Sequence, residues 1–231
     1  MTKHDIRALV AEVPLFDGLT GHELDRLAAS AGHAHLADRA NLISLSQPGD
    51  IAYFILKGTL RVQVEEEDGS LVILAFLGAG DLVGEMSVLD RDARSATVVS
   101  VEPCELLWLD RATLEDALRA MPAMAHNLLR LLSRRLRLAN ERILALSTLD
   151  VRGRVARQLA ALADAYGPPG GAGAVTIPLR LTDSDVAALV GASRERVNQV
   201  MGEMRDRGLI VREADHRISV RNREDLASRY G

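Results

Sequence analysis

The chain has 231 residues, with 28 basic and 32 acidic side chains, a formal charge of −4 and 48% apolar residues, which suits one large globular domain or two small ones. The single cysteine, Cys104, excludes an internal disulfide framework and a single-chain cluster of cysteine ligands. No uncharged apolar stretch reaches the roughly 18 residues of a membrane span, and no signal peptide is visible, so we expect a cytoplasmic protein without a membrane partner.

The first part of the chain predicts short helices followed by strands. Thr20–Glu23 has the spacing of a helix-capping box within the helical patterns of residues 5–31. From about residue 33 to 109, short apolar runs such as Leu60–Val64 and Leu71–Leu77 are separated by glycines or turns, with Glu67–Ser70 typical of a hairpin turn. Short strands at this spacing predict an antiparallel sandwich or barrel.

A helical region begins near Asp110, is interrupted by Pro122, and continues as one long helix from Met124 to Leu149. One face of this helix has apolar residues stepping by three and four, as in a heptad seam: Leu129, Leu132, Leu136, Ala139, Ile143 and Leu146. A second apolar line follows another face: Met124, Leu128, Leu131 and Leu138. Two such faces favour a helix that packs on its own domain and on a partner helix. A helix buried within a monomer is the alternative.

The C-terminal part predicts another amphipathic helix over residues 150–166, then a glycine- and proline-rich loop at 167–173. Further helices are expected after this loop. The segments Leu209–Val211 and Arg217–Val220 predict a small hairpin.

Residues 182–204 have the pattern of a helix-turn-helix. Thr182 is a helix cap with an acid three residues later, Gly191 suits a tight turn with positive φ, and Ser193 caps the next helix. The small Ala187 permits a close helix crossing. The inward face of the second helix is apolar: Val197, Val200, Met201 and Met204. A helical hairpin in an ordinary core is the alternative.

The outward face of the second helix favours DNA binding over that alternative. It begins with polar residues of types that can read base edges in the major groove: Arg194, Glu195, Asn198 and Gln199. Arg212 and Arg217 lie in the hairpin, where a wing touches phosphates. The charge distribution agrees, because residues 1–148 carry a net charge of −6 and residues 149–231 a net charge of +2.

A second constellation lies in the strand-rich part. Gly84-Glu85-Met86-Ser87 is followed, after six residues, by Arg94-Ser95-Ala96. A short helix starting at this glycine, an arginine fork and a hydroxyl suit a phosphate diester, and Glu85 suits sugar hydroxyls. Taken alone, these residues also fit a surface turn with an Arg–Glu ion pair.

Gly84-Glu85-Met86-Ser87 together with Arg94-Ser95-Ala96 resembles the phosphate-binding cassette of cyclic-nucleotide-binding domains. Together with the long helix and Val190–Glu195, it is similar to the CRP/FNR family of bacterial transcription regulators over roughly residues 10–222. Leu149–Arg154 resembles the hinge of that family.

The resemblance implies a ligand site. Gly84 and Glu85 would hold the ribose hydroxyl, and Arg94 with Ser95 the cyclic phosphate, with Met86, Ser87 and Ala96 completing the cassette. On the long helix, Arg135 would approach the phosphate. Ala139 and Asn140 occupy the positions of the adenine-contacting Thr-Ser pair. The loss of the threonine hydroxyl removes a hydrogen bond worth on the order of 1 kcal/mol.

The resemblance also implies a DNA site at Thr182, Ser193 and the recognition helix. Arg194 and Glu195 match the residues that read G and C. Gln199 stands where an arginine is common, so a half-site related to TGTGA is expected with an altered preference at one base.

Several cofactors and activities are disfavoured by the sequence. Cys104 alone cannot supply an iron–sulfur cluster. The histidines are His4, His22, His33, His35, His126 and His216, and no spacing among them argues for haem or metal ligation. An enzyme using Glu85 and Arg94 on a phosphodiester is disfavoured, because no metal-ligand cluster or activated nucleophile accompanies them.

The expected fold class is α+β. It comprises a cyclic-nucleotide-binding β-roll (jelly-roll-like) at residues 1–121, a dimerisation helix and hinge at 122–149, and a winged helix-turn-helix at 150–231. The expected function is a non-enzymatic homodimeric regulator, paired through residues 124–149, in which a cyclic nucleotide controls binding to a palindromic double-stranded site. The effector is cAMP, or alternatively cGMP, cyclic di-GMP or no ligand. RNA polymerase is an expected partner.

Overall fold

The computed structural model describes residues 3–65, 67, 71–166, 174–222 and 226. The chain divides into two compact units, the first comprising Met1–Glu65 with Leu74–Arg134 and the second Glu66–Ile73 with Arg135–Gly231. Most of the predicted 67–70 turn and the whole 167–173 loop lie outside the described residues. None of the described helices has the length and apolar character needed to cross a membrane.

The first unit begins with helices, as predicted. They are α1 (Lys3–Ala11), the 3-10 helix η1 (Pro14–Phe16) and α2 (Gly21–Ser30). The capping box of α2 is confirmed: the Thr20 side chain accepts a hydrogen bond from the Glu23 backbone N–H, and the Glu23 carboxylate accepts one from the Thr20 backbone N–H. These bonds satisfy backbone donors that have no partner inside the helix.

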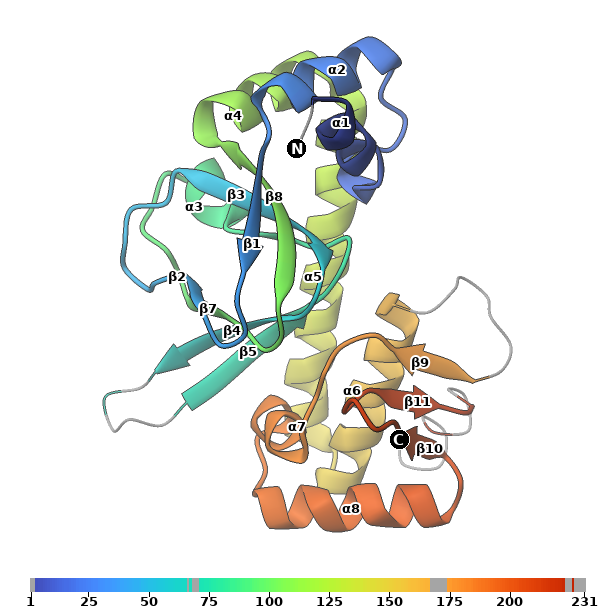
Figure 1. Cartoon of the computed structure of the whole chain (residues 1–231). Helices are drawn as coiled ribbons and strands as arrows, with labels where there is room; N and C mark the ends of the chain where they lie inside the picture. The colour runs from blue at the N-terminus through green and yellow to red at the C-terminus, as the bar shows by residue number, and fades with distance from the viewer. Residues whose placement is uncertain (1–2, 66, 68–70, 167–173, 223–225, 227–231) are drawn as a thin grey trace. The chain divides into compact units, whose positions relative to one another are not determined.

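The predicted antiparallel strands are confirmed, and they form two four-stranded sheets (Figure 1). One sheet has the order β1-β8-β3-β6, with strands at Gly32–Leu36, Cys104–Asp110, Ile51–Lys57 and Leu82–Val83. The other has the order β2-β7-β4-β5, with strands at Asn41–Ile43, Thr97–Ser100, Leu60–Glu65 and Leu71–Leu77. The short helix α3 (Glu85–Leu89) follows β6.

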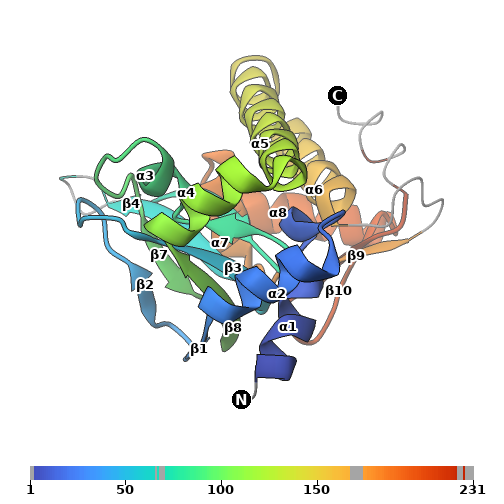
Figure 2. The ribbon, with the colours of Figure 1, turned by 90° about the horizontal axis from the view of Figure 1, so that it is seen from above.

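Two apolar clusters hold the first unit together. Residues from both sheets form one of them, which includes Ile55, Leu60, Val98 and Leu106. The second joins β3 and β8 to the helices, and α4 (Arg111–Ala120) and α5 (Pro122–Thr148) contribute to it. Figure 2 looks down on α1, α2 and α4, which lie over one end of the strands.

The interruption at Pro122 proves to be the start of α5. A proline at the first helical position loses no hydrogen bond, because that N–H has no partner in any helix. Met124 and Leu128, from the second apolar line of the sequence, are buried in the cluster that the helices form.

The preceding helix, α4, begins at a side-chain cap. Asp110 accepts a hydrogen bond from the Thr113 backbone N–H at 2.8 Å.

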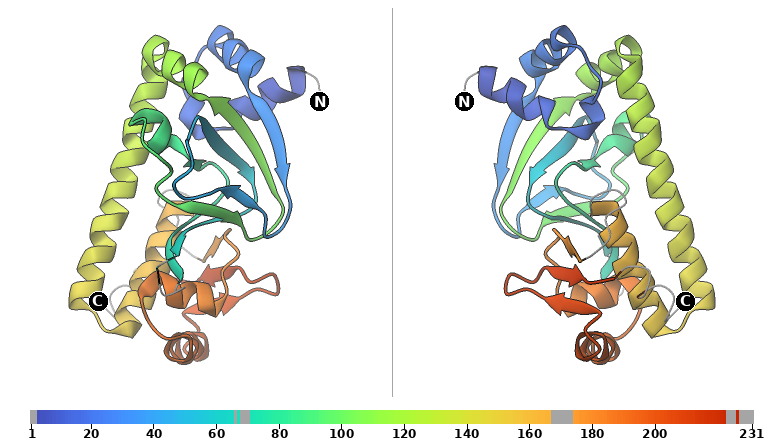
Figure 3. Two further views of the ribbon diagram at one scale, coloured as in Figure 1. Left: turned by 90° about the vertical axis from the view of Figure 1, so that its left-hand side faces the viewer. Right: turned by 90° about the vertical axis from the view of Figure 1, so that its right-hand side faces the viewer.

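The second unit contains the predicted helix-turn-helix and hairpin. Its helices are α6 (Val151–Tyr166), α7 (Asp183–Val190) and α8 (Arg194–Asp206). The hairpin consists of β10 (Ile210–Arg212) and β11 (Ile218–Val220). Figure 3 views α8 end-on beside this hairpin.

One element of the second unit contradicts the sequence interpretation. Only helices were expected between the glycine-rich loop and the hairpin, but Val175–Ile177 forms a strand, β9, that pairs antiparallel with β11. The wing is therefore the edge of a three-stranded sheet of order β10-β11-β9. Three residues are too few for a periodic signal, and the partner strand lies about forty residues later in the chain.

Candidate functional site

The cassette motif begins where β6 ends. Gly84 adopts a left-handed conformation with φ 83° and forms the N-cap of α3. A Cβ at this position would lie 2.6 Å from Arg94 Nη1 and 2.9 Å from the Ile51 carbonyl oxygen. Glycine is therefore required both by the backbone conformation and by the close approach of its neighbours.

Arg94 is the buried cation of the cassette, with 8% of its surface exposed. Its Nη1 donates to the Gly84 carbonyl and to Ser87 Oγ, both at 2.8 Å, and its Nη2 donates to the Ile51 carbonyl at 2.7 Å. These bonds use three of the five guanidinium N–H donors. Burial lowers the pKa of the Arg94 guanidinium. None of the ion pairs within the described residues neutralises it.

The remaining cassette residues divide into buried and exposed groups. Glu85 and Ser87 are 4% and 3% exposed, and Ala96 is buried as well. Met86 and Ser95 are exposed, and the Ser95 hydroxyl lies 3.8 Å from the Met86 sulfur. The structure therefore brings the cassette residues together around Arg94, with polar groups both beneath the surface and at its rim.

Two further residues support the cassette, and sequence reasoning missed both. Arg111 donates from Nη2 to the Gly49 carbonyl at 2.7 Å and from Nη1 to the Val88 carbonyl at 3.3 Å. A Cβ on Gly49 would lie 2.2 Å from Ser87 Oγ, so only glycine fits beneath this hydroxyl. Neither residue belongs to a local motif, because the strands bring them to the cassette from about 20 to 35 residues away in the chain.

The ligand-binding candidates on the long helix belong to the other compact unit. Arg135, Ala139 and Asn140 lie on α5, where Arg135 is partly buried and the other two are exposed. Along the predicted seam, Leu132 packs partly on the core of the first unit. The large seam residues that remain exposed are Leu129 (64%), Leu136 (63%), Ile143 (62%) and Leu146 (49%).

The helix-turn-helix is built as the sequence predicts. The Thr182 side chain accepts a hydrogen bond from the Asp185 backbone N–H, and the Asp185 carboxylate accepts one from the Thr182 N–H. Gly191 ends α7 in the left-handed conformation, with φ 61°. Ser193 caps α8 by accepting a hydrogen bond from the Arg196 backbone N–H. The predicted inward face of α8 is buried: Val197, Val200, Met201 and Met204.

The four candidate base-reading side chains of α8 are all exposed: Arg194, Glu195, Asn198 and Gln199. Gln199 is held from two sides, because it accepts a hydrogen bond from Arg196 at 2.7 Å and donates one to Glu203 at 3.2 Å. Within the described part of the chain, the side chains of Arg194, Glu195 and Asn198 have no such partner. They are therefore available to an external ligand.

The two candidate wing arginines are engaged inside the second unit. Arg212 donates from Nη1 to the Leu181 carbonyl at 2.6 Å and pairs with Asp183 in the first turn of α7. Arg217 donates to the Pro178 carbonyl at 2.8 Å and pairs with Asp215. Both fasten the wing to the segment before α7, and their contact with phosphates stays a prediction.

Arginines of the predicted hinge segment also brace the helix-turn-helix, which the sequence did not reveal. Arg154 donates from Nη1 to the carbonyls of Val190 and Gly191, at 2.7 and 3.1 Å. Arg152 forms an ion pair with Glu203 of α8 at 3.0 Å. Asp150 caps α6 through the Gly153 N–H. The C-terminal end of α7 and the C-terminal half of α8 are therefore both tied to α6.

Comparisons with known proteins match the two parts of the chain that contain these candidate sites. The family model for the cyclic nucleotide-binding domain matches residues 34–121, and the model for the Crp-like helix-turn-helix domain matches residues 153–229. The chain is 31% identical over 221 residues to a CRP-like cAMP-activated global transcriptional regulator of Mycobacterium tuberculosis, covering 96% of this chain and 98% of that protein.

Two further comparisons are with Thermus thermophilus. The cyclic AMP receptor protein is 37% identical over 199 residues, covering 85% of this chain and 88% of that protein. The crystal structure of the catabolite activator protein aligns with a TM-score of 0.52 at 32% identity, covering 94% of this chain and 100% of that one. The curated relatives are named as transcription regulators or receptors, roles that are not enzymatic.

Proposed function

Because the chain belongs to the CRP/FNR family of transcription regulators, we propose that it is a homodimer whose affinity for a palindromic DNA site is set by a bound cyclic nucleotide. The proposed domains are a sensor at residues 1–121, a dimerisation helix and hinge at 122–149, and a DNA reader at 150–231. It would act in the cytoplasm, with RNA polymerase as its further partner.

The observation that carries the sensor role is the buried guanidinium of Arg94. A buried guanidinium that makes no direct ion pair within the described residues is costly, and a phosphodiester anion is the compensating partner that the family's cassette binds. The two N–H donors of Arg94 that the described hydrogen bonds leave unused suit a two-pronged contact with phosphate oxygens. Glu85, buried beside this site, suits the ribose hydroxyl.

We take cAMP as the first candidate effector, because the relatives from Mycobacterium tuberculosis and Thermus thermophilus are named for cAMP. Ala139 and Asn140 keep the alternatives open. Without a threonine hydroxyl at position 139, the helix offers the adenine ring one hydrogen bond fewer. The alternatives are the same DNA-binding role with cGMP or cyclic di-GMP as effector, or with no ligand.

Titration calorimetry of the full chain with cAMP, cGMP and cyclic di-GMP tests the sensor role. Arg94→Gln should abolish binding of the tightest nucleotide, because a neutral amide cannot compensate the phosphate charge. Arg119→Gln is the matched control, since Arg119 is an exposed arginine of α4 that pairs with Glu115 and Asp116 and makes no contact with the cassette in the described residues, so this variant should keep nucleotide affinity. Binding that survives Arg94→Gln, or the absence of binding by all three nucleotides, would contradict the proposal.

The same titration tests the effector assignment. Ala139→Thr restores a hydroxyl, so it should tighten cAMP binding about fivefold, the equivalent of about 1 kcal/mol. Ala139→Val introduces a side chain of nearly the same shape as threonine without the hydroxyl, so it should not increase the affinity for cAMP. If both variants behave alike, position 139 does not contact the base, and the identity of the effector rests on the cassette alone.

The DNA-binding role rests on α8 and on a second copy of the chain. Palindromic sites require two recognition helices about one DNA turn, ~34 Å, apart. The exposed apolar stripe on α5, formed by the seam residues Leu129, Leu136, Ile143 and Leu146, is the proposed contact between the copies. The hinge near Asp150–Gly153 would transmit the change in the sensor to the DNA-binding part. The ligand gates binding only if it prefers the DNA-competent state.

A further inference from the structure

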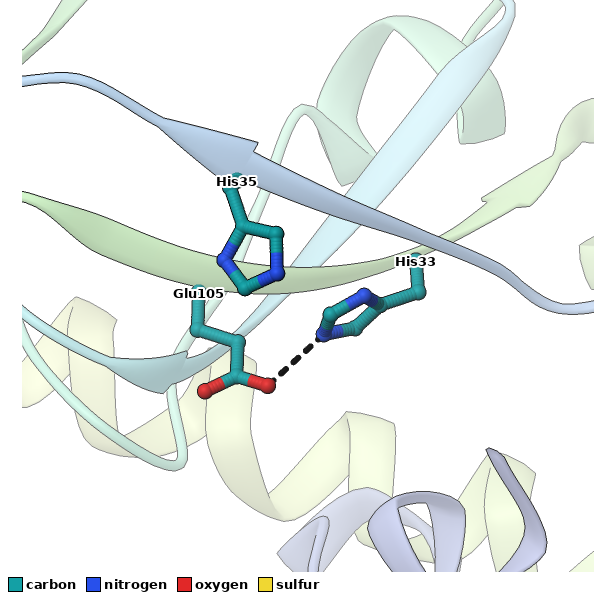
Figure 4. Close-up of side chains that lie close together, drawn as sticks. All are labelled: His33, His35 and Glu105. Carbon is teal, nitrogen blue, oxygen red and sulfur yellow. Dashed lines mark hydrogen bonds and ion pairs between the residues drawn. The ribbon is translucent and has the colours of Figure 1, made fainter. Parts of the chain in front are cut away.

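Two histidines and a glutamate converge on one face of the β1–β8 pair (Figure 4). His33 and His35 alternate on β1, so both side chains leave the strand on the same side. In the antiparallel register, His35 lies directly opposite Glu105 of β8. His33 is therefore the diagonal neighbour of Glu105, within reach of a long side chain.

No spacing among the histidines in the sequence pointed to this arrangement. The His-x-His spacing means little in a loop but places both rings on one face of a strand. The third member comes from a strand seventy residues later, so the cluster became visible only when the pairing of β1 with β8 was known.

The three side chains are already close together. His33 Nε2 lies 2.7 Å from Glu105 Oε1, and the rings of His33 and His35 meet edge to face with their centroids 4.7 Å apart. One ligand atom from each of the three residues lies within 4.8 Å of the others. Ligand atoms in a tetrahedral zinc site are about 3.4 Å apart, given bonds of about 2.0–2.1 Å. Side-chain rotations that move these atoms by about an ångström complete the geometry.

The backbone that carries the cluster is held firmly. β8 lies between β1 and β3, so both edges of Glu105's strand are paired. Leu107, opposite His33 in the register, is 1% exposed and anchors this face of the sheet in the helical core. The His33 side chain is 12% exposed and that of Glu105 is 32% exposed, while His35 is open to solvent. A metal ion can therefore enter from the solvent side without any opening of the fold.

We propose that His33, His35 and Glu105 form a binding site for a divalent transition-metal ion, with Zn²⁺ as the best match. Two imidazoles and one carboxylate are donors that suit Zn²⁺, whereas Mg²⁺ and Ca²⁺ prefer oxygen ligands throughout. Metal binding breaks the hydrogen bond between His33 and Glu105, and the neutral His33 ring then carries its proton on Nδ1 and offers Nε2 to the metal. Three protein ligands leave one coordination position for water.

The charge around the site sets an upper bound on its affinity. Glu105 is the one anionic ligand, so the metal complex keeps a net charge of +1. Lys57 of β3 pairs with Glu105 across the edge of β8 that faces away from β1. Its positive charge lies near the site and opposes the binding of a cation. We therefore expect weaker binding than in a closed structural zinc site with several thiolates.

The test uses the untagged full chain, stripped of metal with a chelator, in competition with a chromophoric chelator for added Zn²⁺. One equivalent of Zn²⁺ should bind per chain. His33→Ala, His35→Ala and Glu105→Gln should each weaken binding at least about tenfold, the smallest effect usual even for groups that only support a metal ligand. His126→Ala, which removes an exposed histidine of α5, is the matched control and should leave the affinity unchanged.

A second readout guards against variants that bind less because they unfold. Zn²⁺ should raise the unfolding temperature of the wild-type chain and of His126→Ala, but not that of His35→Ala, whose exposed ring can be removed with little effect on the metal-free fold. The proposal would be overturned if the wild type and the three cluster variants bound Zn²⁺ with the same weak affinity. It would also be overturned if His126→Ala lost as much Zn²⁺ affinity as the cluster variants. No nucleotide or DNA enters these measurements, so their outcome is independent of the proposed regulatory function.

Discussion

At the scale of single residues, the cassette makes one arginine serve both fold and ligand. Arg94 holds the Gly84 and Ile51 carbonyls in place and is proposed to hold the phosphate with its remaining donors. Such an arrangement positions the guanidinium before the ligand arrives, so little conformational entropy is lost on binding. It also makes the site sensitive to any change that moves the neighbouring backbone.

Gly84→Ala tests that sensitivity. Gly18 is the matched control, because its φ of 80° nearly equals that of Gly84 and a Cβ there would meet nothing within 4 Å. Gly18→Ala should cost about 1 kcal/mol in backbone strain. Gly84→Ala should cost about 3 kcal/mol, because its Cβ also overlaps Arg94 and the Ile51 carbonyl.

Urea denaturation followed by Trp108 fluorescence measures both costs, since Trp108 is the single tryptophan and lies in the first unit. Gly84→Ala should also weaken nucleotide binding, whereas Gly18→Ala should not. Equal denaturation midpoints for the two variants would mean that the close packing around Gly84 contributes nothing to stability.

The residues that sequence reasoning found are those within short motifs. Thr182, Gly191 and Ser193 have local roles, in caps and a turn, and the structure bears these roles out. Gly49, Arg111 and the cluster of His33, His35 and Glu105 were missed, because their partners lie in distant parts of the chain. The sequence gives the chemical type of each side chain, but which distant residues lie beside it depends on the register of the sheet.

At the scale of secondary structure, α5 has two apolar faces, of which one is buried in the first unit and the other is exposed. Met124 and Leu128 are buried in the first unit, while Leu136 and Ile143 are 63% and 62% exposed. A sustained heptad stripe of this kind is the typical surface of a helix pair. The heptad pattern therefore predicted the face that stays uncovered within one chain, though not which copy or partner covers it.

Replacing a central residue of the stripe tests its role. Leu136→Glu should convert the dimer to a monomer, because it places like charges at the centre of an apolar contact. Arg134→Glu, a substitution on the outward side of the same helix, should leave the dimer intact. Sedimentation equilibrium measures both; a dimer that tolerates Leu136→Glu would show that the copies associate elsewhere.

The recognition helix α8 makes a separate prediction. Arg194→Ala should cost about 1–3 kcal/mol of DNA affinity and relax the preference at one base pair of each half-site. Arg205→Ala, at the exposed C-terminal end of the same helix, should change affinity slightly and leave the sequence preference unchanged. Selection from a randomised duplex library, followed by affinity measurement, gives both quantities. An unchanged base preference in Arg194→Ala would remove Arg194 from the reading set.

The limits of sequence reasoning at this scale are visible in β9. The helix-turn-helix has strong local signals, and its boundaries were found closely. β9 has three residues and owes its existence to its pairing with β11, so no local pattern announces it. Long elements with regular periodicity are predictable, whereas short strands depend on their partners.

At the scale of the whole molecule, the charge is divided between two roles. Residues 1–148 carry a net charge of −6, and residues 149–231 carry +2. The part of the chain that contains the helix-turn-helix is therefore slightly basic, although the overall charge is −4. A net charge of +2 gives modest non-specific attraction to DNA. In the proposed homodimer, specific contacts from two copies of α8 would supply most of the affinity.

In the proposed regulator, nucleotide binding and DNA binding are coupled. This coupling is measured by the Kd of the selected palindromic duplex with and without a saturating concentration of the tightest-binding nucleotide, and by the Kd of that nucleotide with and without the duplex. We expect each ligand to tighten the binding of the other by the same factor, on the order of 5- to 150-fold. A DNA affinity that saturating nucleotide leaves unchanged would contradict this coupling.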